Sequence, residues 1–141
     1  MRSLIALAMF ALAVVLPLRA ALPQGESDQA AIQEVIRSQL EAFKHDDGAR
    51  AYSYAAPNIQ MLFPSVDRFM EMVKKGYAPV YRPRSYSFRP LEHKEGSIVQ
   101  SVEILGPDGE YWTAEYFLEQ QPDGSWKITA CHLVKAEGGA A

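Results

Sequence analysis

Cysteine is almost absent from this sequence of 141 residues, because Cys131 is the only one. A single cysteine excludes an internal disulfide and a zinc site built from several cysteines. Basic residues are also scarce, with 14 Lys and Arg against 17 Asp and Glu. An acidic chain has no positive field to attract nucleic acid, so the sequence predicts no nucleic-acid partner.

Long apolar runs are missing except for one, from Leu4 to Leu18. Arg2 precedes this run, and Ala20 and Ala21 follow it. Positive charge, apolar stretch and small residues in this order are typical of a secretory signal peptide, and a membrane span needs roughly 20 residues. We therefore predict that residues 1–20 are a cleaved signal peptide, that no stable membrane span remains, and that the protein is periplasmic or secreted. An uncleaved anchor is the alternative.

The remainder of the chain shows no internal repeat, phosphate-binding loop, nucleophile elbow or metalloprotease motif. Helical patterns fill its first half and strand patterns fill its second half, and this segregation indicates an α+β fold. We predict one α+β domain over residues 27–135 and a disordered tail over 136–141. We predict no cofactor and no metal site.

The first half of the domain carries apolar residues at helical spacing. Ser27 is a suitable N-cap for a first helix that runs to about His45. Its apolar face is formed by Ile32, Val35, Ile36, Leu40 and Phe43. Three further helical segments are predicted over residues 48–56, 59–63 and 66–75, the last with Ser65 as its N-cap.

The second half of the domain is divided by strong turn signals. Pro107-Asp108-Gly109 and Pro122-Asp123-Gly124 each place proline first and glycine at the left-handed position, which predicts three-residue hairpin loops. The sequence therefore predicts an antiparallel meander of four strands, over residues 84–92, 97–105, 110–120 and 125–135.

The hairpin loops also predict the register of the strands, because loop length determines which residues face each other. The two loops pair Gly106 with Glu110 and Gln121 with Ser125. This register places the even-numbered residues of the last three strands under the helices. The predicted partners include Val102–Ala114, Gln100–Tyr116, Ala130–Tyr116 and His132–Ala114.

A candidate ligand site follows from that register. Its residues are Gln100, Ala114, Tyr116, Ala130 and His132. The two alanines are small and leave room for a ligand on a face that helices cover. The polar side chains beside them need hydrogen-bond partners. Small apolar and polar side chains together are typical of a mostly apolar pocket. The opposite face, on which this register places Cys131, is mixed and is a candidate homodimer interface.

Several short segments are similar to a bacterial family known only as a domain of unknown function. They are residues 39–43 (QLEAF), Asp46-Asp47, 69–77 (FMEMVKKGY), 107–109 (PDG), 114–116 (AEY) and 123–126 (DGSW). The order of helices followed by a bent antiparallel sheet resembles the cystatin-like cone of the nuclear-transport-factor-two-like superfamily, which includes SnoaL-like proteins. The resemblance covers roughly residues 31–134 and implies a cone-shaped fold.

The resemblance does not imply one activity. The superfamily includes isomerases, dehydratases, epoxide hydrolases, binding domains and dimerisation domains, and the fold alone does not choose among them. Its isomerase-like members place a carboxylate on the sheet, whereas the predicted covered face has no Asp or Glu between residues 97 and 134. We therefore carry over no catalytic residue.

The sequence favours an exported, non-catalytic domain that binds a small, mostly apolar ligand or a partner protein between sheet and helices. One alternative is a small-molecule lyase, isomerase or hydrolase in which His132 acts as acid or base and Tyr116 donates a hydrogen bond. Against this, His132 and Tyr116 could simply satisfy each other in the core. A dimerisation module is the third hypothesis.

Overall fold

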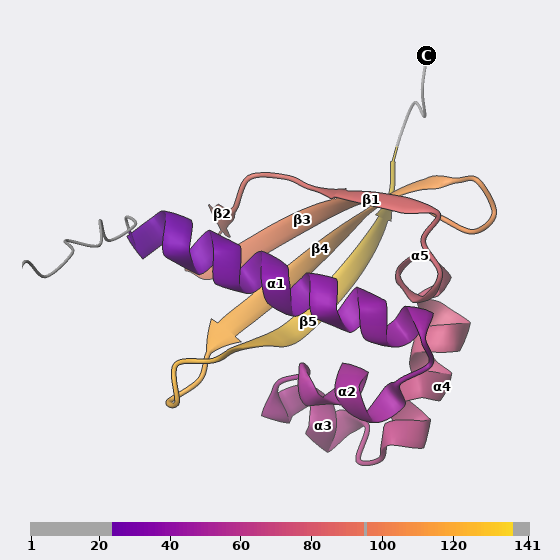
Figure 1. Ribbon diagram of the computed structural model, residues 1–141, viewed down its shortest axis with the longest axis horizontal. Helices are drawn as coiled ribbons and strands as arrows, with labels where there is room; N and C mark the ends of the chain where they lie inside the picture. The colour runs from indigo at the N-terminus through magenta and orange to yellow at the C-terminus, as the bar shows by residue number, and fades with distance from the viewer. Residues whose placement is uncertain (1–23, 95, 137–141) are drawn as a thin grey trace, which may run out of the picture.

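Five helices precede a five-stranded antiparallel sheet in the computed structural model, which describes residues 24–94 and 96–136. The sheet is not closed (Figure 1). The helices are α1 (Gln24–Lys44), α2 (Gly48–Ser53), α3 (Pro57–Leu62), α4 (Val66–Gly76) and α5 (Ala78–Tyr81). The strands are β1 (Ser85–Phe88), β2 (Glu92–Lys94), β3 (Ser97–Leu105), β4 (Tyr111–Gln120) and β5 (Trp126–Lys135).

The predicted signal peptide lies outside the described residues, as does the predicted tail beyond residue 136. Across the part of the chain that the structure describes, none of the helices combines the length and apolar character that crossing a membrane requires. The prediction of an α+β fold is confirmed, since the helices come first and the antiparallel strands follow.

Helix α1 lies diagonally across one face of the sheet (Figure 1). It begins at Gln24, three residues before the predicted N-cap. Its apolar stripe is buried against the sheet, and Ile32 and Ile36 have no exposed surface. Burial of such a stripe is what holds a surface helix to its domain.

The short helices follow local capping signals. The Asp47 carboxylate accepts a hydrogen bond from the Arg50 amide at the start of α2, and Ser65 caps α4 in the same way. The sequence predicted helical segments over 48–56 and 59–63, but α2 ends at Ser53 and α3 already begins at Pro57, because proline fits the first turn of a helix. Helix α5 was not predicted.

The sheet has the strand order β1–β3–β4–β5, with β2 also paired to β3. The predicted strand over 84–92 is therefore two strands separated by a segment that contains Pro90, which cannot donate to a ladder. Both predicted hairpins are confirmed. Gly109 and Gly124 have φ values of 85° and 87°, the left-handed conformation that these turns require.

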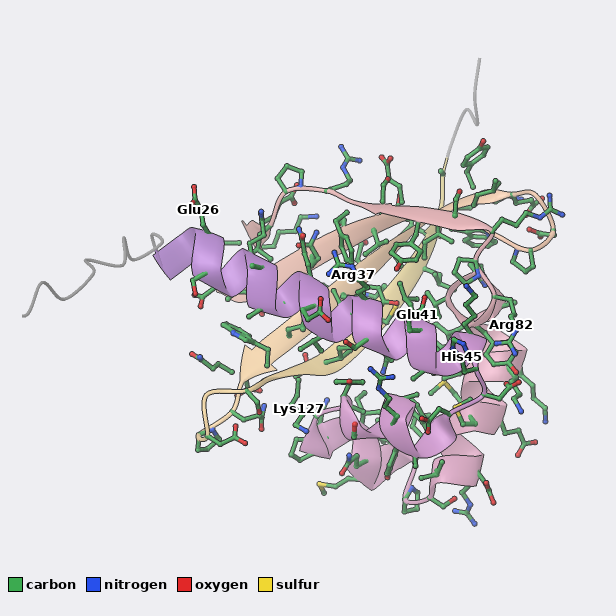
Figure 2. The ribbon with its side chains drawn as sticks, viewed as in Figure 1. Glu26, Arg37, Glu41, His45, Arg82 and Lys127 are labelled. Atoms are coloured by element: carbon green, nitrogen blue, oxygen red, sulfur yellow. The ribbon has the colours of Figure 1, made fainter. Side chains whose placement is uncertain are left out.

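The start of strand β5, an edge strand, is covered by the connection between α2 and α3. The amide of Ala56 donates to the Ile128 carbonyl at 2.8 Å, and the Ile128 amide donates to the Tyr54 carbonyl at 2.9 Å. The side-chain amide of Asn58 donates to the Thr129 carbonyl at 3.0 Å. Lys127, labelled in Figure 2, donates to a carbonyl of α2. These bonds protect part of the edge and place α3 beside it.

The end of α1 is tied to α5 by Arg82, which lies near His45 in Figure 2. One guanidinium nitrogen of Arg82 donates to the Phe43 carbonyl, and another donates to the Asp46 carboxylate at 2.9 Å. The Tyr81 hydroxyl also donates to Asp46, and this bond holds the pKa of Asp46 below its usual value. Helices α4 and α5 are thereby held against the end of α1.

Candidate functional site

A β-bulge at Thr129 determines which side chains of β5 lie under the helices. Leu118 pairs with Ile128, but Phe117 pairs with Ala130, so Thr129 is the extra residue on β5. A bulge of this kind leaves one residue unpaired and reverses the alternation of side chains beyond it. The predicted register is therefore correct for β3 against β4 and for the start of β5, and wrong beyond Thr129.

Beyond the bulge, odd-numbered residues of β5 face the helices. Cys131 pairs with Tyr116, and Leu133 pairs with Ala114. The predicted pairs Ala130–Tyr116 and His132–Ala114 are wrong, and so is the placement of Cys131 on the opposite face. His132 instead pairs with Glu115 and is exposed.

The His132 ring lies against Phe117 on the uncovered face of the sheet, with ring centroids 5.1 Å apart. Among the described residues it has no hydrogen-bond partner. Tyr116, by contrast, is 1% exposed and belongs to the core. The two side chains therefore leave the sheet on opposite faces, and the sequence prediction that they meet under the helices is wrong.

The Gln100 side chain is fully buried, and both of its polar atoms are hydrogen-bonded. Its side-chain oxygen accepts from Gln33 of α1 at 3.2 Å, and its side-chain nitrogen donates to the carbonyls of Arg89 and Ser101. It does not line the cavity described below, and neither does Ala114. Gln100 fastens α1 to the sheet, which satisfies a buried amide as the interior requires.

A cavity of about 360 Å³ lies between β5 and helices α3, α4 and α5. Helix α3 forms one wall, although none of its residues is buried and Leu62 is 71% exposed. The opposite wall is the bulged segment of β5 together with Tyr116 of β4. The lining residues are Gln39, Phe43, Ala55, Asn58, Ile59, Leu62, Phe63, Phe69, Met72, Val73, Tyr77, Val80, Tyr116, Ile128, Thr129, Ala130, Cys131 and His132.

The wall formed by α3 is held by hydrogen bonds to α2. The Tyr52 hydroxyl donates to the Phe63 carbonyl at 2.6 Å, and the Gln60 side-chain amide donates to the Tyr52 carbonyl at 3.1 Å. Gln39 of α1 donates to the Ala51 carbonyl at 3.1 Å and lines the inner end of the cavity. These bonds tie the wall to the helices around it, although α3 itself is exposed.

The Tyr116 hydroxyl is the unusual polar group of this cavity. It is buried and has no hydrogen-bond partner of normal geometry. Burial keeps its pKa well above the usual range, because the phenolate would lose its hydration. The neighbouring Cys131 thiol is neutral as well, since burial raises its pKa to about 12. A thiol with that pKa is not an activated nucleophile.

The described lining has further polar side chains at Gln39, Asn58, Thr129 and His132, but most of the rest is apolar and none is Asp, Glu, Lys or Arg. Tyr77 adds a second phenol at the cavity wall, and burial raises its pKa too. Two arginines that precede β3 in the chain are engaged elsewhere: Arg84 donates to the Pro107 carbonyl at 2.8 Å, and Arg89 pairs with Glu103 at 3.2 Å. The arrangement suits an apolar molecule rather than an ion.

A metal centre has no basis in the described residues, which contain no cluster of three or more His, Cys, Asp or Glu side chains able to hold an ion. His45 bonds to the carbonyl of Glu41 at 2.9 Å. Asp46 is bound by α5, and Asp47 caps α2. The three consecutive residues therefore serve the end of α1 and the start of α2.

Ala130 and His132 also line a second, more polar hollow of about 510 Å³ near the turn between β4 and β5. Sequence reasoning placed Tyr116 at the cavity, as the structure does, but missed Cys131, Gln39 and the apolar wall from α3 to α5. The helical spacing of Phe69 and Val73 was a usable signal for that wall. The sequence contains no comparable signal for the bulge that turns Cys131 inward.

The chain matches the family described as "Domain of unknown function (DUF4864)" over residues 25–141. No curated protein and no solved structure matches it.

Proposed function

The chain belongs to the DUF4864 family, a domain family of unknown function, and we propose that it is a binding domain which holds a small, mostly apolar molecule in the cavity between β5 and helices α3 to α5. The observation that carries the proposal is the cavity itself, whose volume of about 360 Å³ falls within the range of small-molecule sites. Its walls are mostly apolar, and hydrogen bonds tether the wall formed by α3 to α2.

Binding of N-phenyl-1-naphthylamine, an uncharged fluorescent probe, tests this proposal. We expect saturable fluorescence enhancement with the purified protein. Ile59→Trp extends a side chain from α3 into the cavity and should weaken binding at least about tenfold. Met61→Trp is the matched control, because Met61 lies on the same helix, does not line the cavity and is 81% exposed. Equal effects of the two variants, or no binding by the unmodified chain, would refute the proposal.

Native mass spectrometry of the purified protein provides an independent check. A bound small molecule that is present in the unmodified chain and lost from Ile59→Trp would identify the natural ligand class directly.

A catalytic role for His132 with Tyr116 receives less support than binding. The two side chains lie on opposite faces, and no described residue orients the His132 ring through a hydrogen bond. Replacing His132 by Gln should therefore change probe binding little, because the imidazole, although it lines the cavity, lies against Phe117, and binding of an uncharged probe needs no acid or base.

A homodimer through the uncovered sheet face is a second candidate, favoured by the exposed hydrophobic residues at one end of that face. Val134 is 48% exposed and Tyr111 is 45% exposed on neighbouring strands. Sedimentation equilibrium should show association that Val134→Glu abolishes and Met61→Glu does not. A monomer at all concentrations would exclude it.

We further propose that the fold is a cone of the nuclear-transport-factor-two-like superfamily and that the protein is exported. Helices packed on one face of an antiparallel sheet support the first proposal. The apolar run from Leu4 to Leu18 supports the second. An experimental structure with a strongly curved sheet would test the fold. Fractionation and N-terminal sequencing of the protein would test export, and an N-terminus at Met1 would exclude cleavage.

A further inference from the structure

Building on the proposed function, we propose that the molecule held in the cavity is uncharged and carries one hydrogen-bond acceptor, such as a ketone or ester carbonyl oxygen, that binds the hydroxyl of Tyr116. The observation behind this is that Tyr116, whose buried hydroxyl lacks a hydrogen-bond partner of normal geometry, lines the mostly apolar cavity together with Cys131, which lies beside that hydroxyl. Buried polar groups are nearly always hydrogen-bonded, so an exception at a cavity wall points to a missing partner.

The hydroxyl can serve only as a donor to such a ligand at neutral pH. Its pKa is raised far above the usual value, so the proton stays on the oxygen. The side chain cannot turn away, because Tyr116 is 1% exposed and is held between the core of the sheet and the helices. A fixed, protonated phenol at the inner end of an apolar cavity favours a ligand with an acceptor at that end.

Cys131 shares this part of the wall and lies directly opposite Tyr116 in the sheet. Its thiol interacts with the hydroxyl, but the contact lacks the geometry of a normal hydrogen bond, and sulfur is a weak acceptor. A carbonyl oxygen is a much better acceptor. We therefore infer that the bound carbonyl takes the place of the thiol beside the hydroxyl, which needs only a rotation of the small Cys131 side chain.

Because the lining has no Asp, Glu, Lys or Arg, we expect the cavity to reject charged ligands that have the same shape as an uncharged one. None of the cavity residues is Lys or Arg, and His132 lies against Phe117 on the other face of the sheet, so a carboxylate would have no permanent cation beside it. None is Asp or Glu, so an ammonium group would also be unpaired. An unpaired buried ion is far more costly than an unpaired neutral group.

The volume limits the size of the ligand. An apolar protein cavity of about 150 Å³ accommodates benzene. A cavity of about 360 Å³ therefore has room for a molecule of about twice that size, such as a bicyclic ring with a short substituent.

Three naphthalenes of matched shape test the inference by titration calorimetry of the purified chain. They are 2-acetylnaphthalene with a ketone, 2-isopropylnaphthalene without an acceptor, and 2-naphthoate with a carboxylate. We expect the ketone to bind about fivefold to tenfold more tightly than the isopropyl compound, the range for one hydrogen bond in a protein, and the carboxylate not to bind measurably. The carbonyl stretching band of the bound ketone should move to lower wavenumber.

Tyr116→Phe removes only the hydroxyl. We expect it to bind the two uncharged naphthalenes with equal affinity and to leave the carbonyl band of bound ketone unshifted. Cys131→Ala should tighten ketone binding, because the thiol no longer has to move. If Tyr116→Phe keeps the preference for the ketone, the inference is wrong while the apolar cavity stands. Tight binding of 2-naphthoate would also overturn it. If no naphthalene binds, the proposed function fails and the inference fails with it.

Discussion

Tyr116 and Cys131 lie directly opposite each other on β4 and β5, with both side chains under the helices. In a regular antiparallel ladder read from the hairpin at Pro122, Tyr116 would face Ala130 instead. The one extra residue at Thr129 makes the difference. Both residues line the cavity, and most of the predictions about the site concern them.

Tyr116→Phe should stabilise the ligand-free protein by about 1 kcal/mol, because it removes a buried hydroxyl that has no partner. Tyr52→Phe is the matched control. It deletes a hydroxyl that donates to the Phe63 carbonyl at 2.6 Å and should destabilise by about 1 kcal/mol. Urea denaturation measures both values. A loss of stability in Tyr116→Phe would mean that the hydroxyl already has a good partner in the native state.

The Cys131 thiol should react slowly with a thiol reagent such as dithionitrobenzoate at pH 8. With a pKa of about 12 instead of 9.0, the thiolate population is about 1,000-fold lower than in the unfolded chain. We expect full reactivity to appear in urea. Rapid reaction of the native protein would contradict this prediction. It would mean that the sulfur lies on the uncovered face, where a regular strand without the bulge would place it.

The same thiol should make folding stability depend on alkaline pH. Its pKa is raised in the native state, so the stabilisation is complete below pH 9 and is lost as the pH rises from about 9 towards 12, where only the unfolded chain releases this proton. The slope for one such group is about −1.4 kcal/mol per pH unit. Lys and Tyr side chains titrate in the same pH range. The informative quantity is therefore the difference between the unmodified chain and Cys131→Ala in the slope of unfolding free energy against pH. Parallel curves would contradict burial of the thiol.

Gln100→Leu should destabilise the protein by about 2–3 kcal/mol, because it removes the donor to the Arg89 and Ser101 carbonyls and breaks the bond to Gln33. Gln33→Ala should cost about 1 kcal/mol, since it removes one partly buried bond only. Probe affinity should stay the same in both variants, because neither residue lines the cavity. A weakened probe affinity in a folded Gln100→Leu would show that the ligand reaches further along β3.

The local parts of the fold were largely readable from the sequence. The turns at Gly109 and Gly124, the cap at Ser65 and the stripe of α1 depend on nearby residues, and each was predicted and confirmed. The pairing of β3 with β4 followed from the same kind of reasoning, because a three-residue loop leaves little freedom to the strands that it joins. The predicted ends of the elements were less accurate. Helix α3 begins before its predicted start, and the predicted first strand is divided into β1 and β2.

The candidate site was not readable in the same way. Thr129 is an ordinary strand residue in the sequence, and nothing near it indicates that β5 contains an extra residue. In the structure its carbonyl accepts from Asn58, its hydroxyl donates to the Phe117 carbonyl, and the connection before α3 pairs with Ile128. Contacts between residues about 70 positions apart therefore accompany the bulge, and local patterns cannot report them.

The sequence by itself determined the α+β class, the hairpins and the acidic composition with a single cysteine, because these depend on composition and on spacing within a few residues. Only the tertiary structure decided that Cys131 rather than His132 faces the helices. One inserted residue reverses the alternation of a strand, and the interactions that accommodate it come from α2, α3 and β4, which lie far away along the chain.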